Sequence, residues 1–369
     1  MKKLFFLFIA LLSTLALLAQ HTITGTVTDA ETGAPLEGAS VFAQNTTVGA
    51  ITNKEGVFTL TLGRGGYELN ATYTGYQNGM RTFVTGTTDT LHFQLRKADN
   101  SMSEVIVTAS NEVADGWEKH GDFFLKHFIG TTPFADSTTL LNPEVLKFYF
   151  YKRSNKLKVL ATEPLQIQNA ALGYNLRYNL DSFVHYNATN INSYRGLCLF
   201  MPMEGTPEQA AQWAQNREKA YYGSRLHFLR AYYDSTLKEE GFNVDILSTR
   251  DLRKFDRLVN PYDSLYYFSD SATGDVELWF PKKASITYNK QKPEPAYLQQ
   301  FKLPADVGVQ ISYVDLLDAI VVKPNGFFLE QRSWVNQGYW SWKNLADLLP
   351  YDYEPVVEAA FSKEVTFQQ

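Results

Sequence analysis

The sequence predicts a mainly β fold with some α-helix, in which a seven-stranded type of β-sandwich precedes a larger α+β domain. Short segments between residues 21 and 97 alternate apolar and polar side chains, which is typical of antiparallel sheets with one wet face. Glycine and proline separate these segments as turn residues. After residue 112, strand-like segments are interrupted by patterns with helical spacing, which predicts a mixed second domain.

The first nineteen residues are expected to be a secretory signal peptide. Lys2 and Lys3 precede an apolar stretch that runs through Leu18, and Ala19 is a small residue at the expected cleavage point. An uncleaved membrane anchor is the alternative, but the polar residues that follow favour cleavage. No cysteine follows the stretch, which argues against a lipoprotein. No later segment approaches the roughly 18 apolar residues that span a bilayer, so no transmembrane segment is expected after signal removal.

Charge and cysteine content restrict the function classes. Without Lys2 and Lys3 the chain has 32 basic and 39 acidic residues, and this acidic balance argues against nucleic acid as a partner. Cys198 is the single cysteine, so an internal disulfide framework is excluded. Stability must therefore come from a packed core, for which aromatic residues, 14% of the chain, supply ample material.

Residues 21–97 are expected to form the sandwich. The stretches 57–62, 67–73 and 91–96 each alternate, so that Phe58, Leu60 and Leu62 share one face, as do Leu91, Phe93 and Leu95. Residues 53–56 could suggest a calcium loop, but such a loop needs six or more oxygen ligands that this stretch lacks. We interpret residues 53–56 as a hairpin turn, in which glycine supplies a positive φ.

Within residues 23–76 the sequence resembles the carboxypeptidase-regulatory-like domain, a transthyretin-like (prealbumin-like) β-sandwich. The matching positions are Gly25, Val27, Asp29, Gly33, Pro35, Leu36, Ala39, Val41, Gly49, Thr52, Gly56, Phe58, Gly75 and Tyr76. Asn53 stands where the family often has aspartate. The resemblance implies an accessory module of secreted and outer-membrane proteins in Bacteroidota-type bacteria, often at the start of nutrient transporters. It does not imply peptidase activity.

Carboxypeptidase chemistry is not expected, because the zinc motifs are absent. None of the six histidines is followed three residues later by glutamate, as a zinc carboxypeptidase requires. His120 and His127 could share a helix face, but their spacing is a weak metal signal. We therefore expect no metal and no cofactor. Cys198 lies in an apolar strand and is expected to be inert core.

Residues 98–111 are expected to form a linker with one short strand. Residues 104–110 resemble the strand at which transporters driven by the energy-transducing protein of the inner membrane are engaged. A plain connecting strand is the alternative, since such short motifs are weak. The rest of the chain is too short for the plug and barrel of such a transporter.

Residues 112–369 are expected to form the α+β domain, with helices over 117–130, 207–240 and 342–349 and a turn at Asn325–Gly326. A bend is expected at Gly223 and Ser224 in the second helix. This domain is similar to the uncharacterised body of other secreted Bacteroidota proteins that begin with the same sandwich.

Two groups in this domain are candidates for function. Ser224 and His227 could share a helix face as part of a hydrolase site, although no Gly-x-Ser-x-Gly motif surrounds them and a capping role for Ser224 is the alternative. Four aromatic residues cluster near the end of the chain and are the predicted ligand-binding residues: Trp334, Tyr339, Trp340 and Trp342. Exposed, they would stack on sugars or anchor a partner; buried, they would be core.

These observations favour an exported, non-enzymatic binding or scaffold protein of the cell envelope, located in the periplasm or at the outer membrane or cell surface. The expected partner is an envelope protein or a glycan. Two alternatives stay open: an envelope hydrolase with its site in the second domain, and an accessory component of an outer-membrane nutrient transporter.

Overall fold

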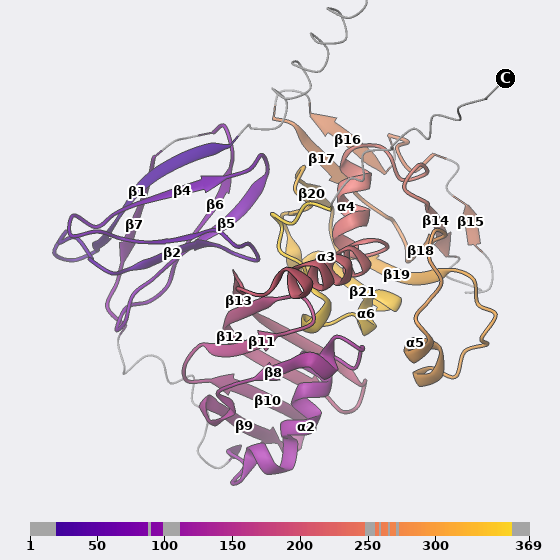
Figure 1. Cartoon of the computed structure of the whole chain (residues 1–369), viewed down its shortest axis with the longest axis horizontal. Helices are drawn as coiled ribbons and strands as arrows, with labels where there is room; N and C mark the ends of the chain where they lie inside the picture. Colours follow the sequence, from indigo (N-terminus) through magenta and orange to yellow (C-terminus); the bar gives the residue numbers. More distant parts are fainter. Residues whose placement is uncertain are drawn as a thin grey trace, which may run out of the picture.

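The computed structural model describes residues 20–87, 90–98, 111–247, 255–257, 260–264, 266–270 and 273–355. The expected signal peptide, residues 1–19, and the transporter-like strand at 104–110 lie outside this part of the chain. Strands predominate over helices, and a sheet domain is followed by a larger domain with more sheets and few helices, which confirms the predicted fold class (Figure 1). The buried apolar side chains of the described part form three large cores.

The sandwich contains seven strands in two sheets, as expected. One sheet has the order β4-β1-β7 and the other β3-β2-β5-β6. The strands are β1 (His21–Asp29), β2 (Ser40–Ala43), β3 (Gly49–Ile51), β4 (Val57–Leu62), β5 (Gly66–Thr72), β6 (Gly79–Val84) and β7 (Thr90–Leu95). Phe58 and Phe93 face each other in the core between the sheets, as the alternation predicts. At the predicted turn, the Gly56 amide donates to the carbonyl oxygen of Asn53 over 2.9 Å, with Gly56 at φ 71°.

The second core lies between helix α2 (Gly116–Phe128) and a six-stranded antiparallel sheet. Strand β12 (Tyr174–Tyr186) is central: it pairs with β13 (Ile191–Pro202) along one side and with β11 (Leu165–Asn169) and β10 (Lys156–Ala161) along the other. Strands β8 (Thr138–Leu140) and β9 (Leu146–Tyr151) complete the sheet. The helix ends where predicted, because Gly130 follows with a positive φ.

The third core joins helix α4 (Arg225–Tyr233) to two antiparallel sheets. The larger sheet has the order β15-β14-β18-β19-β21, from strands β14 (Phe242–Leu247), β15 (Phe255–Arg257), β18 (Ala284–Tyr288), β19 (Gln310–Leu316) and β21 (Trp334–Gly338). The smaller sheet has the order β16-β17-β20, from β16 (Tyr267–Asp270), β17 (Asp275–Leu278) and β20 (Ile320–Val322). Two short helices, α5 (Pro295–Gln300) and α6 (Tyr339–Trp342), lie beside the larger sheet.

Two predicted helices have different boundaries in the structure. The expected helix over 207–240 is α3 (Pro207–Tyr221) followed by α4, with the bend at Gly223 and Ser224 as predicted. It ends at Tyr233 because Ser235 adopts φ 58°, which turns the chain and buries Leu237 in the third core. The expected helix over 342–349 was also wrong. Helix α6 ends at Trp342, and after the extended Asn344 only a 3-10 turn, Leu345–Asp347, follows.

The sandwich is fixed to the body by backbone hydrogen bonds. The Asn45 amide donates to the carbonyl oxygen of Cys198 over 2.7 Å, and the Phe200 amide donates to that of Thr46 over 2.9 Å, so the β2–β3 loop extends the edge of β13. Asn325 closes a second contact, since its side-chain nitrogen donates to the Gly66 carbonyl oxygen over 2.9 Å and its side-chain oxygen accepts from the Gly66 amide over 3.2 Å. The predicted Asn325–Gly326 turn therefore also holds the sandwich.

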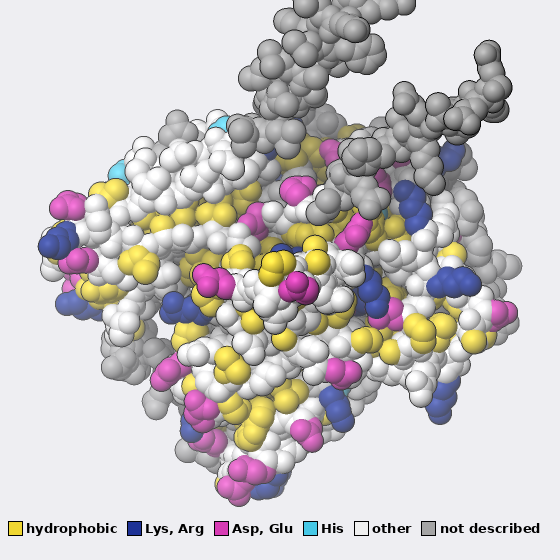
Figure 2. Space-filling view, in the orientation of Figure 1, with side chains coloured by type: hydrophobic (Ala, Val, Ile, Leu, Met, Phe, Trp, Pro, Cys, Tyr) yellow, Lys and Arg dark blue, Asp and Glu magenta, His cyan; other side chains and the backbone are white. Residues whose placement is uncertain are grey.

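Acidic and basic side chains are interspersed on the face shown in Figure 2, with apolar side chains between them and no continuous basic area. Nucleic-acid binding requires clustered positive charge, so this face, like the acidic balance of the sequence, does not favour a nucleic-acid partner.

Candidate functional site

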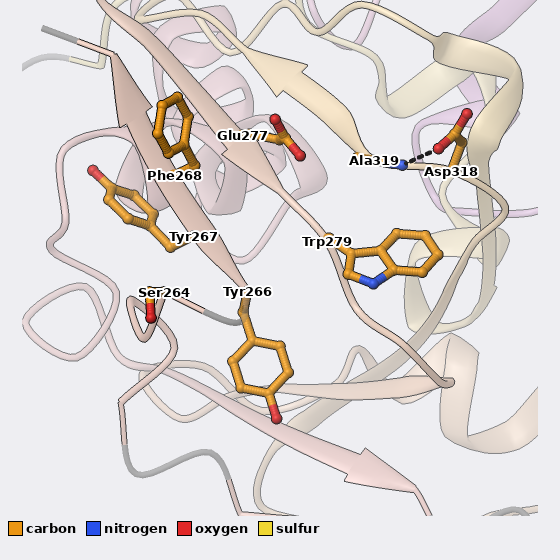
Figure 3. A pocket seen from close by; sticks show the side chains of 8 residues that line it. All are labelled: Ser264, Tyr266, Tyr267, Phe268, Glu277, Trp279, Asp318 and Ala319. Atoms are coloured by element: carbon orange, nitrogen blue, oxygen red, sulfur yellow. Dashed lines mark hydrogen bonds between the residues drawn. The ribbon is translucent and has the colours of Figure 1, made fainter.

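A pocket of about 270 Å³ lies on the outer face of the sheet β16-β17-β20. We call it the outer-face pocket. It is lined by Ser264, Tyr266, Tyr267, Phe268, Glu277, Trp279, Asp318 and Ala319 (Figure 3). Three different segments of the chain contribute to it, and the strand register brings them together.

The alternation along the strands explains which side chains reach this pocket. Phe268 pairs with Glu277, and Glu277 pairs in turn with Val321, so these three residues form one row across the sheet. The next row, Tyr267, Leu278 and Ile320, points to the opposite face, where Leu278 and Ile320 are completely buried in the third core. Tyr267 packs against the same core and also borders the pocket. Because successive side chains on a strand point to opposite faces, Tyr266 and Trp279 lie on the same face as Phe268 and Glu277.

The outer face keeps apolar rings in contact with solvent. Phe268 is 62% exposed, and Trp279 is partly exposed on the neighbouring strand. Figure 3 shows the Glu277 carboxylate between these two rings, with Asp318 on the segment that enters β20. An exposed ring lacks the hydrophobic stabilisation that it would gain by burial, and because it borders an open hollow here, the pocket is a candidate binding surface.

Neither carboxylate of the pocket has a cationic partner among the described residues. Asp318 accepts a hydrogen bond from the amide of its neighbour Ala319 over 2.9 Å, and Glu277 forms no hydrogen bond or ion pair with a described residue. On the same strand, two residues before Glu277, Asp275 forms an ion pair with Lys323. The position across from Glu277 is Val321, which cannot supply a charge.

The four aromatic residues predicted to bind a ligand are buried, and the structure divides them between two places. Trp334 and Trp340 belong to the third core, where the Trp340 indole nitrogen donates to the Gly223 carbonyl oxygen over 2.7 Å. Tyr339 and Trp342 pack with Tyr297 in a separate group, which we call the closed aromatic cluster. The structure therefore has the buried arrangement, which the general burial of large aromatic side chains favours, and their role in binding stays a prediction.

The closed aromatic cluster surrounds a lysine of the chain itself. The ammonium of Lys343 lies 5.1 Å from the Trp342 ring centre and 5.4 Å from that of Tyr339, within the range of a cation–π contact. It also forms ion pairs with Glu294 and Asp347, the latter at 3.0 Å. Burial lowers the pKa of Lys343, but the two carboxylates more than offset this effect, and the pKa lies above its ordinary value.

Ser224 and His227 do not form a catalytic pair. The Ser224 hydroxyl accepts a hydrogen bond from the His227 backbone amide over 3.1 Å, which caps α4, so the capping alternative is confirmed. The His227 ring is occupied elsewhere: Nδ1 accepts from the Gly223 amide over 3.1 Å, and Nε2 lies 3.0 Å from Glu240. Burial among aromatic rings lowers the pKa of His227 to about 4, so the ring is neutral near pH 7.

The other sequence-predicted groups are structural in the described part of the chain. His120 stacks on Phe148, and His127 Nδ1 lies 2.8 Å from the Phe123 carbonyl oxygen. No group of three or more potential metal ligands occurs among the described residues. Cys198 is completely buried, and burial raises the pKa of its thiol well above the ordinary value, as expected for inert core.

The residues of the outer-face pocket were missed by the sequence analysis. A signal for them exists: in the stretches 266–270 and 275–279, aromatic or apolar residues occupy adjacent positions, so both faces of each strand carry apolar side chains. A strand that is apolar on both faces is normally buried on both. The structure shows that Phe268, on the outer face of this sheet, is 62% exposed, so the described elements leave its ring largely uncovered.

Residues 23–107 match the family model of the CarboxypepD_reg-like domain, and the described part of this stretch is the sandwich. The predicted resemblance is therefore confirmed. The match continues past Lys97 into residues that the structure does not describe. No curated protein matches the chain. Within the described residues, no helix combines the length and the apolar character that crossing a bilayer requires.

Similarities to solved structures are weak. The group B streptococcus pilus 2b backbone protein shares 19% identity over 21% of this chain and 41% of its own, with a TM-score of 0.19. A protein of unknown function from Bacteroides fragilis, described as membrane-associated, shares 14% identity over 44% of this chain and 64% of its own, with a TM-score of 0.18. A 9R-lipoxygenase from Cyanothece shares 10% identity over 60% of this chain and 49% of its own, with a TM-score of 0.18. The chain thus spans less than two thirds of each of these proteins, and no function follows from similarities at this level.

Proposed function

We infer that this chain is an exported binding protein of the cell envelope, in which the outer-face pocket binds the ligand and the sandwich holds the body in place. The observation that supports this function best is the exposed aromatic face of the sheet β16-β17-β20, where Phe268 is 62% exposed beside Glu277 and Trp279. Such a face loses stabilisation in the free protein and regains it when a ligand covers the rings.

The family of the first domain supports the location. Carboxypeptidase-regulatory-like domains are accessory modules of exported proteins, and the start of the sequence has the features of a signal peptide. The hydrogen bonds from the β2–β3 loop and from Asn325 make this module a rigid part of the body. We infer that the sandwich sets the orientation of the body, and that the pocket provides the recognition.

A binding survey with the mature chain tests this function. Calorimetric titration would use two ligand classes, neutral oligosaccharides and short peptides, against the unchanged protein and a double variant, Phe268→Ala with Trp279→Ala. The matched control is Ile51→Ala, which removes an exposed apolar side chain, 72% exposed, from the sandwich. We expect at least one class to bind saturably, the double variant to lose that binding by tenfold or more, and the control to keep it. Binding that persists in the double variant, or its absence in both classes, would refute the proposal.

A further inference from the structure

The outer-face pocket has an unusual charge composition. Two of the eight residues that line it, Glu277 and Asp318, are carboxylates, and none is basic. Several other acidic side chains of the body pair with cations: Asp275 pairs with Lys323, Asp315 with Lys283, and Glu240 lies 3.8 Å from Lys290. The pocket thus concentrates negative charge beside aromatic rings without an internal cation.

The closed aromatic cluster combines the same kinds of group with a cation. There, two carboxylates, Glu294 and Asp347, and the rings of Tyr339 and Trp342 surround the Lys343 ammonium. Rings present the negative face of their quadrupole to the cation, and the carboxylates neutralise its charge. The outer-face pocket contains the rings and the carboxylates of this arrangement, and it lacks the cation.

Resting on the binding function inferred above, we propose that the outer-face pocket binds the cationic side chain of an arginine or lysine on a peptide or protein partner. The negative charge of Glu277 and Asp318 attracts such a group, and the partly exposed rings of Phe268 and Trp279 pack on its flat or aliphatic parts. A volume of about 270 Å³ is enough to hold one side chain of a partner.

A neutral sugar fits this charge distribution less well. Covering two carboxylates with an uncharged ligand removes water from them without supplying a compensating charge, which costs free energy. An anionic ligand would in addition be repelled by both groups. The register leaves Glu277 between Phe268 and Val321, so its described neighbours across the sheet supply no compensating charge.

The test compares two peptides that differ at one group of nearly the same shape. Gly-Arg-Gly, blocked at both ends, and its counterpart with citrulline, in which a neutral urea replaces the guanidinium, would be titrated into the mature chain and followed by NMR. We expect the arginine peptide to bind at least tenfold more tightly, and its binding to weaken as ionic strength rises. A lysine peptide should bind in preference to its acetylated form for the same reason.

Variants test the same proposal from the side of the protein. Glu277→Gln should weaken binding of the arginine peptide roughly tenfold, because it removes one charge and keeps the shape of the side chain. Glu55→Gln, at an exposed turn of the sandwich, is the matched control and should leave binding unchanged. Thermal unfolding of both variants verifies that they fold, and the peptide comparison on the unchanged protein needs no variant.

The outcomes separate this proposal from the function on which it rests. Equal binding of the arginine and citrulline peptides, or unchanged binding in Glu277→Gln, would overturn the recognition of a cation. If a neutral oligosaccharide binds and loses affinity in the variant with Phe268→Ala and Trp279→Ala while the arginine peptide does not bind, the pocket is a ligand site for sugars, and only the present proposal fails. If no probe binds at all, both fail.

Discussion

The closed aromatic cluster and the outer-face pocket contain the same kinds of side chain, aromatic rings and carboxylates, but only the cluster also contains a cation. In the closed cluster, Tyr297, Tyr339 and Trp342 are buried, and Lys343 fills the space between rings and carboxylates. In the pocket, Phe268 is mostly exposed and Trp279, which also packs against the third core, is partly exposed, beside carboxylates without a cation among the described residues. This difference shows that a group of aromatic residues in the sequence does not by itself indicate a binding site. What distinguishes the two regions is whether the fold itself supplies the partner of the rings.

The largest effect is expected from removing that internal partner. Lys343→Met keeps the length of the side chain but leaves the buried Asp347 without a cation and leaves Glu294 with the half-exposed Lys219 alone. Breaking a buried ion pair on one side costs about 3–5 kcal/mol, and we expect the free energy of unfolding in urea at pH 7 to fall by about this amount. The loss should shrink as the pH is lowered toward 5, because burial already raises the pKa of Asp347 and protonation removes one uncompensated charge.

The matched control for this variant is Lys219→Met, which removes the second cation near Glu294. The Lys219 side chain is half exposed, at 50%, so its ion pair should contribute no more than about 1 kcal/mol. Equal losses in the two variants would contradict the comparison, since they would show that burial among the rings does not increase the contribution of Lys343 to stability.

A smaller effect is expected at His227, where aromatic rings surround a basic group with one partly exposed carboxylate instead of two buried ones. Burial is the main cause that lowers the pKa of His227 from 6.5 to about 4, and a proton on Nδ1 would also face the Gly223 amide. Between these pH values the unfolded chain binds a proton and the folded chain does not. The stabilisation is therefore complete above pH 6.5 and is lost as the pH falls toward 4.

Urea unfolding at pH 7.5 and pH 5 measures this contribution. We expect the unchanged protein to lose about 2 kcal/mol more over this interval than His227→Gln, which cannot be protonated there. His92→Gln, at an exposed position of the sandwich, is the control and should follow the unchanged protein. If His227→Gln shows the same pH profile as the unchanged protein, the ring is charged in the folded state, and aromatic burial alone does not hold it neutral.

The sandwich could be predicted from the sequence because its information is local. Period-two alternation placed Phe58 and Phe93 in the core, and the turn at Gly56 required only a positive φ. The suggestion that Ser224 and His227 form a hydrolase pair was wrong for a local reason as well. A serine that caps a helix and a histidine three residues later have the same spacing whether or not the hydroxyl contacts the imidazole ring. The helix after Gly223 stopped at Tyr233 because burial of Leu237 outweighed the helical pattern.

The site could not be predicted because its information is not local. The residues next to Trp342 and Trp279 do not decide which ring is covered, because the cover comes from contacts with residues that are distant along the chain. Trp342 is covered because its indole nitrogen donates to Gln300 over 2.9 Å and its ring packs on Tyr297. Trp279 follows β17, where its amide donates to the Tyr266 carbonyl oxygen, and the described residues leave its side chain partly exposed. Whether distant residues bury such a ring depends on the tertiary structure, and a period-two sequence pattern does not predict it.

The smallest effect on stability is expected in the pocket itself, and it completes the comparison. Phe268→Ala removes a ring that is 62% exposed, so little buried apolar area is lost and no cavity forms. The free energy of unfolding should change by no more than about 0.5 kcal/mol, as for most surface substitutions. Trp342→Ala in the closed cluster is the matched substitution and should cost about 3–5 kcal/mol, because that ring is buried and hydrogen-bonded. Urea unfolding of the two variants side by side measures the difference. A loss at Phe268 that approaches the loss at Trp342 would mean that the outer face is part of the core, and the pocket would then have no surplus apolar surface to offer a ligand.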